Sequence, residues 1–340
     1  AIETGEITEE RLAHSVKKIL RSKFIAGLHK YQPIVISQLV ESLHTEQDDV
    51  VYENAISKAI TVLKNKRGIL PIQNLETKKI AYVELGDDSG SVFFEELNKY
   101  AQVDKVVGDK LDDLLKKLQK YNTVIIGLHR SNDNPWKSYN LKELELTWLY
   151  EIARKHNVIF DGFVRPYMLD QIKTSENFEA ILMSYQNSVW SQKVSAQIIF
   201  GARDAIGRLP VSAGLFKVNE GLDVKNNKRL SYGDNPSSVG FDARMVAQID
   251  SVALHTIHGK GAPGMQILVA RRGKVILNKS YGYHTYDNKD QVTSSDIYDI
   301  ASVTKILATL PLVMELEEKK IISLDDVISK LDKDLYLIHI

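Results

Sequence analysis

The sequence contains no cysteine, which excludes disulfide bonds and cysteine-ligated metal sites. It also has no apolar run that approaches the roughly 18–20 residues of a membrane-spanning helix, so no membrane span is expected in this chain. Charge of either sign is not in excess, since 44 Lys and Arg residues balance 44 Asp and Glu residues. This balance provides no basic field for nucleic acid and no acidic tail, and no nucleic-acid partner is expected.

The composition is typical of a folded globular protein, with 44% hydrophobic and 26% charged residues. A chain of 340 residues is too long for one ordinary hydrophobic core, so two or more domains are expected. The sequence starts with AIETGEITEERL, which carries neither an initiator Met nor a signal peptide. Such a start is typical of a processed chain or a fragment, and it leaves the cellular compartment undetermined.

Two helices are expected near the beginning of the chain. Leu12, Val16 and Ile19 form an apolar helical stripe, with Thr8 as the N-cap. The pattern of residues 48–65 predicts a second helix, which ends at the turn KRGILPI.

From about residue 78, short apolar runs alternate with amphipathic helices. The expected strands are KIAYVEL, NTVIIGLH, NVIFDGFV and EAILMSY. The expected helices between and after them are SVFFEELNKYA, KLDDLLKKLQKY, LKELELTWLYEIARKH and SVWSQKVSAQIIFG. Strands of this kind, separated by helices, predict an α/β fold in which a mostly parallel sheet is sandwiched by helices on both faces.

The last third of the chain has a different pattern. Residues 207–238 are rich in Gly, Asn, Ser and Pro and predict a closing loop and linker, with a domain boundary near Pro236. Asp242 is expected to cap the helix FDARMVAQIDSVALHTIH, and GMQILVARRGKVILNKSYGY predicts a β-hairpin that turns at RRG. A final helix is expected from about residue 301 to residue 319.

That last helix begins with SVTK, a Ser-x-x-Lys pattern formed by Ser302 and Lys305. Residues three apart on a helix have Cβ atoms about 5–6 Å apart, so Lys305 can reach the hydroxyl of Ser302. Unpaired N–H groups near a helix N-terminus also favour a developing oxyanion. A lysine with the ordinary pKa of about 10.4 is a poor base, and lowering it to about 7–8 requires desolvation or a cationic neighbour.

The sequence offers an internal control for this pattern. Ser15 and Lys18 also form Ser-x-x-Lys, but they lie within a charged helix and are expected to form a solvated helix face. Ser302 differs because a β-hairpin precedes it and a long apolar helix follows it. The pair Ser302 and Lys305 is therefore the candidate nucleophile and base.

The segments GAPGMQILVARRGKVILNKSYGY and SSDIYDIASVTKILATLPLVMELEEKKIISLDD closely resemble the serine β-lactamase and penicillin-binding-protein superfamily. The resemblance is to the N-terminal part of its class C and esterase-like branch, and it covers about residues 238–333. It implies that Ser302 is acylated and that Lys305 assists as the base. It also implies that the backbone N–H of Ser302 forms half of the oxyanion hole.

Two other elements of that superfamily are missing from their expected places. The superfamily has a Tyr-x-Asn or Ser-x-Asn element and a Lys/His-Thr/Ser-Gly strand, both downstream of the serine. The second triplet does not occur in this sequence, and the Tyr-x-Asn matches at Tyr52, Tyr185 and Tyr286 all lie upstream of Ser302. With 15 tyrosines, such matches are expected by accident. Ser302 is therefore expected to be the right serine in an incomplete site.

The segments ITEERLAHSVKKILRSKFIAGL, AISKAITVLKNKRGILPI, YNTVIIGLH, VRPYML and IIFGARDAIGRLPVSAG together resemble glycoside hydrolase family 3, in its bacterial β-N-acetylglucosaminidase branch. That resemblance implies a TIM-type barrel followed by an α/β sandwich. Residues 1–45 would be the tail of the barrel and a linker, and residues 46–235 would be the sandwich. Residues 236–340 would then be the N-terminal part of a β-lactamase-like α+β domain.

A retaining glycosidase needs a carboxylate nucleophile and a separate acid/base. In the resembled family both groups lie on the barrel, upstream of residue 1, so no glycosidase residue is assigned. His129 and Asp133 could mimic an acid/base dyad, but a polar turn is the favoured interpretation. Glu84 and Asp87 follow a strand and could line a ligand crevice, although no Gly-x-Gly-x-x-Gly pattern supports one.

No metal site and no cofactor are expected. His255 and His258 are three residues apart on a helix, but they lack a third ligand and are interpreted as solvated side chains. Trp136, Trp148 and Trp190 are interpreted as core or loop anchors rather than sugar platforms.

The resemblances imply a fragment of a bifunctional hydrolase, in which a β-N-acetylglucosaminidase is fused to a serine acyl hydrolase. The implied substrate is peptidoglycan or a related amino-sugar glycan, and the implied location is periplasmic or extracytoplasmic. This piece is expected to be inactive alone. The alternative is a non-catalytic glycan-binding or scaffolding module. A nucleotide-binding α/β protein also fits the alternation but lacks a phosphate loop.

The β-lactamase-like part is expected to bury too little apolar surface to stand alone. It should become ordered only by docking on the sandwich or on a second chain. Its incomplete edges also make self-association an expected property.

Overall fold

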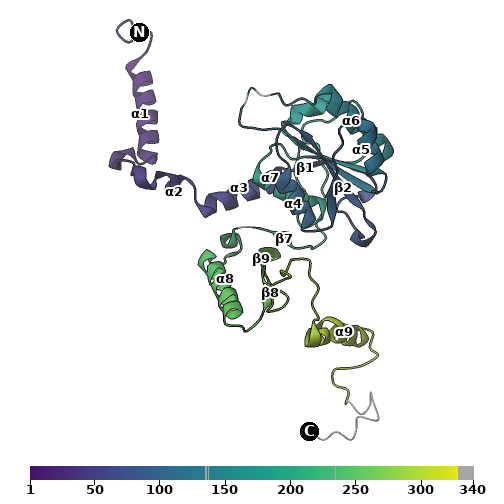
Figure 1. Ribbon diagram of the computed structural model, residues 1–340. Helices are drawn as coiled ribbons and strands as arrows, with labels where there is room; N and C mark the ends of the chain where they lie inside the picture. Colours follow the sequence, from purple (N-terminus) through teal and green to yellow (C-terminus); the bar gives the residue numbers. More distant parts are fainter. Residues whose placement is uncertain (135, 137, 234, 328–340) are drawn as a thin grey trace. The chain divides into compact units, whose positions relative to one another are not determined.

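Figure 1 shows the computed structural model of the chain, in which residues 1–134, 136, 138–233 and 235–327 are described. The described residues form two compact units. The first contains Ala1–Asp250 together with Leu268–Leu277, and the second contains Ser251–Ile267 and the residues from Asn278 onward.

The helices are α1 Glu9–Ile25, α2 Leu39–Leu43, α3 Glu46–Ala59, α4 Ser91–Asn98, α5 Leu111–Leu118, α6 Glu143–Lys155, α7 Val189–Ile199, α8 Ala243–His258 and α9 Leu310–Glu318. The strands are β1 Thr61–Asn65, β2 Ile80–Gly86, β3 Val103–Lys105, β4 Thr123–His129, β5 Val158–Phe163, β6 Phe178–Met183, β7 Ser231–Tyr232, β8 Gly264–Arg271 and β9 Lys274–Gly282.

The first unit is built on a six-stranded sheet with the order β1-β6-β5-β4-β2-β3. Its strands β3, β2, β4, β5 and β6 are parallel, and β1 pairs antiparallel with β6. We call this sheet and the helices α3 to α7 the sandwich (Figure 1). The predicted mostly parallel α/β fold is confirmed, because the four apolar runs identified in the sequence form the central strands.

Helices cover both faces of this sheet. One face packs against α5 and α6, and the other packs against α3, α4 and α7. Alternate residues of β4 separate the two cores, since Val124 and Ile126 lie in the first and Ile125 lies in the second. Strands buried on both faces account for the continuous apolar runs in the sequence.

The helix predicted over residues 48–65 is wrong in its last third. The helix α3 ends at Ala59, and Thr61–Asn65 form β1. The β-branched side chains of Thr61 and Val62 are fully buried, and Val62 pairs with Leu182 of β6. Pairing with a distant strand outweighs the helical periodicity of the local sequence. The three-residue edge strand β3 and the strand β7 were not expected either.

The N-caps at both predicted positions are confirmed. The side chain of Thr8 accepts a hydrogen bond from Arg11 N at 3.2 Å, and Asp242 Oδ1 accepts one from Arg244 N at 2.9 Å. The hairpin of β8 and β9 turns at Arg272 and Gly273, both with positive φ, which fits the two-residue turn preferred by right-twisted strands.

The final predicted helix is not one regular α-helix. Ala301–Val303 form a 3₁₀ turn, Lys305–Thr309 form a π-helical turn, and α9 follows. Pro311 lies in the first turn of α9 and has no N–H with which to bond the carbonyl of Leu307. The regular hydrogen-bond ladder is therefore interrupted immediately before α9.

Phe160 provides a test of the core. Its side chain is 0% exposed among the residues that pack against α5 and α6. We expect Phe160→Ala to lower the free energy of unfolding by about 3–5 kcal/mol, because the cavity cannot fully collapse. Urea unfolding measures this. The control Leu144→Ala alters a side chain of α6 that is 65% exposed and should change stability by less than about 0.5 kcal/mol. A loss below about 1 kcal/mol for Phe160→Ala would contradict the packing.

Candidate functional site

Ser302 and Lys305 lie within the second unit and contact each other directly. Lys305 Nζ donates a hydrogen bond to Ser302 Oγ at 3.0 Å. Ser302 lies in the 3₁₀ turn and Lys305 begins the π-helical turn, so the contact forms without a regular α-helix. The contact expected from the Ser-x-x-Lys spacing is therefore present, while the catalytic roles of the two residues stay a prediction.

The backbone before Ser302 is held in an unusual conformation. Ala301 has a φ of 42°, and its N–H donates to Asp299 Oδ1 at 2.7 Å. Val303 N then bonds the carbonyl of Ile300 at 2.9 Å and starts the turn. A non-glycine residue at positive φ is uncommon, and such strain occurs often where a reactive side chain must be presented.

The chemistry available to this pair depends on its surroundings. For Ser302 to attack an acyl carbonyl, a neutral lysine amine must accept the hydroxyl proton. Burial of the ammonium group would favour the neutral form, but both side chains are exposed in the described chain. The pair thus has the contact geometry of a nucleophile and a base without the desolvation that would activate it.

Apolar side chains around this pair are also exposed. The exposed fraction is 99% for Ile297, 62% for Ile306 and 63% for Leu307. Large apolar side chains that lie this open to solvent close together in the sequence are typical of a surface that other protein normally covers.

The internal control behaves differently. Ser15 Oγ accepts a hydrogen bond from Arg11, one helical turn earlier; this bond is exposed to solvent on α1, and the residue itself is half-buried. The second Ser-x-x-Lys pattern therefore forms a solvated helix face, as expected, and it lacks the serine–lysine contact found at Ser302.

A polar network lies at the carboxyl edge of the parallel strands in the sandwich. His129 is fully buried, with Nδ1 2.7 Å from Asn187 Oδ1 and Nε2 2.8 Å from the hydroxyl of Tyr82. The amide of Asn187 donates to Asp88 Oδ2 at 2.9 Å, and the hydroxyl oxygen of Tyr82 lies 3.3 Å from Glu84 Oε2. Both ring nitrogens of His129 are thus occupied, and its ring stacks on Phe163 with centroids 4.5 Å apart.

These contacts show how the weaker site candidates predicted from the sequence are placed and paired in the structure. His129 is a core residue and is not paired with Asp133, which lies exposed in the following loop. Burial lowers the pKa of His129 to about 4, so the ring is neutral near pH 7. Glu84 forms an ion pair with Lys105 at 2.8 Å, and Asp87 lies 3.5 Å from Arg130 Nη1. The edge is therefore an interlocked network rather than an array of free ligands.

Asp161 on β5 was not singled out from the sequence. It is completely buried and accepts hydrogen bonds from Ser184 Oγ at 2.8 Å and from Ser195 Oγ. Burial raises its pKa to about 7. The sequence signal that could have identified it is a single carboxylate in the apolar run VIFDGF. A carboxylate in a hydrophobic core needs hydrogen-bonding partners, because burial without them is costly.

The remaining candidates have simple positions. His255 and His258 are exposed on α8, and in the described part of the chain no three potential metal-ligating side chains cluster. Trp148 and Trp190 pack against the two cores, as expected, whereas Trp136 is 91% exposed. Within the same described ranges, no helix is long and apolar enough to cross a membrane.

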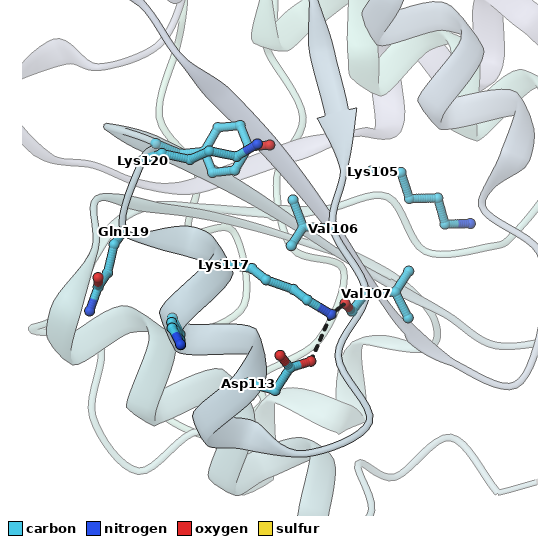
Figure 2. Close-up of a pocket in the computed structure, with 9 residues that line it drawn as sticks. Lys105, Val106, Val107, Asp113, Lys117, Gln119 and Lys120 are labelled. Atoms are coloured by element: carbon cyan, nitrogen blue, oxygen red, sulfur yellow. Dashed lines mark hydrogen bonds and ion pairs between the residues drawn. The ribbon is translucent and has the colours of Figure 1, made fainter.

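A cavity of about 730 Å³ lies beside the edge strand β3 and helix α5 (Figure 2). Its lining includes Lys105, Lys116, Lys117 and Lys120, above an apolar surface that includes Val106. Figure 2 shows Lys117 directed to the carbonyl of Val107 and to Asp113. Because Lys105 and Lys117 already have acidic partners, the cavity is less cationic than its lysines alone indicate.

Two family models match the chain. The Glycosyl hydrolase family 3 C-terminal domain matches residues 60–241, and Beta-lactamase matches residues 244–332. "Protein flp" of Staphylococcus aureus is 37% identical over 83 residues, which is 24% of this chain and 16% of that protein.

The solved structures that resemble the chain include a glycoside hydrolase family 3 β-N-acetylglucosaminidase from Paenibacillus sp. str. FPU-7, with a TM-score of 0.41 and 16% identity. That match covers 63% of this chain and 42% of the enzyme. A β-glucosidase from Listeria innocua has a TM-score of 0.45 and 18% identity, over 61% of this chain and 33% of the enzyme.

The chain spans less than half the length of each of these relatives. The family 3 match covers more than half of the chain, and the β-lactamase match begins three residues after it ends. The chain therefore belongs to the family of the glycosyl hydrolase family 3 C-terminal domain, and a β-lactamase-like segment follows that domain.

Proposed function

We propose that this chain is part of a two-module hydrolase, in which a β-N-acetylglucosaminidase of family 3 is joined to a serine acyl hydrolase. The proposed substrate is peptidoglycan or a related amino-sugar glycan. The observation that carries the acyl-hydrolase half is the 3.0 Å hydrogen bond from Lys305 Nζ to Ser302 Oγ, within the segment that the β-lactamase family matches.

In the proposed reaction, Ser302 Oγ attacks the acyl carbonyl of the substrate while the neutral amine of Lys305 takes the hydroxyl proton. The proton then passes to the leaving group, and water later hydrolyses the acyl-serine ester. The exposed apolar residues around the pair support the proposal that further protein covers it, since such cover would also desolvate Lys305.

The glycosidase half rests on the family of the sandwich. No residue of this chain is proposed as its carboxylate nucleophile or its acid/base. The sandwich would instead support a catalytic domain that supplies both groups.

The experiment is a pair of assays on the full-length protein that carries this chain. We expect release of nitrophenol from an aryl N-acetylglucosaminide and covalent uptake of a fluorescent acylating serine probe. The 340-residue chain alone should show neither activity. Failure of the full-length protein in either assay would refute the corresponding half of the proposal.

One observation favours the alternative of a non-catalytic glycan-binding or scaffolding module. Arg130 is buried at the carboxyl edge of the sheet, where Nη1 lies 3.5 Å from Asp87 and Nη2 pairs with Glu145, and within the described residues its Nε makes no hydrogen bond. Ligands of open α/β sheets bind at this edge. Titration of the 340-residue chain with chitotetraose or a muropeptide, followed by calorimetry, distinguishes the two functions. Binding that Arg130→Lys weakens at least about tenfold supports the module, and absence of binding excludes glycan recognition by this edge.

A further inference from the structure

Residues 268–277 lie in the segment that matches the β-lactamase family, yet they belong to the compact unit of the sandwich. They form the end of β8, the turn and the start of β9. The boundary of the compact unit and the boundary of the family match therefore fall at different positions in the chain. The contacts of this stretch, which we call the hairpin tip, explain the difference.

An ion-pair cluster fixes the hairpin tip to α3. Lys274 Nζ lies 3.0 Å from Oε1 and 3.2 Å from Oε2 of Glu53, which also pairs with Arg203. The three side chains are only 4%, 14% and 13% exposed for Glu53, Lys274 and Arg203. Charged pairs this well shielded depend on each other, because removing one partner leaves a buried charge uncompensated.

A backbone ladder reinforces the same joint. The short strand β7 pairs in parallel with β9, with Ser231 opposite Lys274 and Tyr232 opposite Val275. Ser231 N donates to Gly273 O and Gly233 N donates to Val275 O, both at 3.0 Å. The segment that the sequence marked as a linker thus supplies an edge strand to the hairpin.

The strand β7 is itself fastened to the sandwich. Tyr100 donates from its hydroxyl to Leu230 O at 3.0 Å, and Gln197 Nε2 donates to Tyr232 O at 2.8 Å. Gln197 is 1% exposed and also accepts a hydrogen bond from Arg203 Nε. One continuous polar chain therefore runs from α7 through Arg203 and Glu53 to Lys274.

We infer that α3, β7 and the loop that carries Arg203 together form a docking surface. The segment that docks on it is the hairpin tip of the same chain. Glu53 is the positioning residue of this joint. The tip accordingly folds with the sandwich, although it lies in the segment that the β-lactamase family matches. This inference does not depend on any catalytic role of Ser302.

Hydrogen exchange of the full 340-residue chain, read by mass spectrometry, tests the joint. We expect Glu53→Gln to speed amide exchange in residues 274–277 by at least about tenfold, while exchange in β5 changes by less than about threefold. The matched control is Glu95→Gln, which alters an exposed glutamate of α4 and should leave both regions unchanged. Unchanged exchange of the tip in Glu53→Gln would overturn the inference.

Lys274→Met separates loss of the joint from loss of the fold, because Lys274 is not part of the sandwich. Methionine keeps most of the apolar stem of the lysine and removes its charge, so amide exchange should become faster only in the tip. In the double variant, Glu53→Gln should add little to the effect of Lys274→Met, since both break the same pair. Additive effects, or a Lys274→Met tip that exchanges like the wild type, would overturn the inference even if Glu53→Gln unfolds the protein.

Discussion

Replacement of Ser302 by alanine is expected to abolish covalent labelling of the full-length hydrolase by an acylating serine probe. The substitution removes the oxygen that attacks the acyl carbonyl in the proposed reaction and that accepts the hydrogen bond of Lys305 Nζ in the structure. Because no other group at this position can form the ester, labelling should fall below detection rather than decline in part. Gel fluorescence, followed by peptide mapping of the labelled serine, measures the result.

Lys305→Met should retain the nucleophile and remove its base. Loss of a positioned general base typically slows a reaction about 10²–10⁴-fold, so slow labelling of Ser302 should remain measurable. Raising the pH should partly restore the rate, because hydroxide can replace the lysine amine. This rescue distinguishes the loss of a base from a structural defect.

Ser15→Ala is the matched control, since Ser15 belongs to the other Ser-x-x-Lys pattern and its hydroxyl bonds to Arg11. It should label like the wild type. Labelling that persists in Ser302→Ala, or that maps to Ser15, would show that Ser302 is not the nucleophile. The glycosidase assay of the same samples should stay unchanged and reports that the protein is folded.

The second large effect concerns two buried groups in the sandwich whose protonation affects stability with opposite signs. Burial raises the pKa of Asp161 from an ordinary 3.8 to about 7. Between pH 4 and 7 the folded protein therefore keeps a proton that the unfolded chain has released. Stability falls as the pH rises through this window, by about 1.4 kcal/mol per pH unit and about 4 kcal/mol in all.

His129 has the opposite dependence. Burial lowers its pKa from 6.5 to about 4, so between these values the unfolded chain binds a proton that the folded protein does not. Stability is lost as the pH falls through this window, by about 3 kcal/mol in all. In the wild type the two slopes nearly cancel between about pH 4 and 6.5.

Single variants should reveal each slope. Relative to the wild type, Asp161→Asn should gain about 4 kcal/mol of stability between pH 4 and pH 7, and His129→Gln should lose about 3 kcal/mol between pH 4 and pH 6.5. Urea unfolding at a series of pH values measures both differences. Curves that run parallel to the wild type would contradict the assigned pKa shifts.

Ser184→Ala gives a directional control. Its hydroxyl donates to Asp161 at 2.8 Å and lowers the pKa of that carboxyl. Without this hydrogen bond the pKa should rise further, and the decline of stability with pH should extend above pH 7. A decline that ends at a lower pH would exclude this role for Ser184.

The alternation of strands and helices in the sandwich can be predicted from the local sequence pattern alone. Strands buried on both faces need uninterrupted apolar runs, and helices between them need one apolar side, so both leave a local pattern. The contact of Lys305 with Ser302 was likewise predictable, because a spacing of three residues constrains it. Family resemblance was equally readable, since it depends on short contiguous segments.

Features that depend on partners distant in the sequence are visible only in the folded protein. The segment after Ala59 is a strand because β6 lies beside it, and His129 is a core residue because Tyr82 and Asn187 occupy its nitrogens. In the sequence, Glu53 resembles any charged residue of an exposed helix, because its partner Lys274 is 221 residues away along the chain. Periodicity records which side of an element is buried, but it does not record what buries it, and the pKa of a group or the strength of an ion pair follows from that partner.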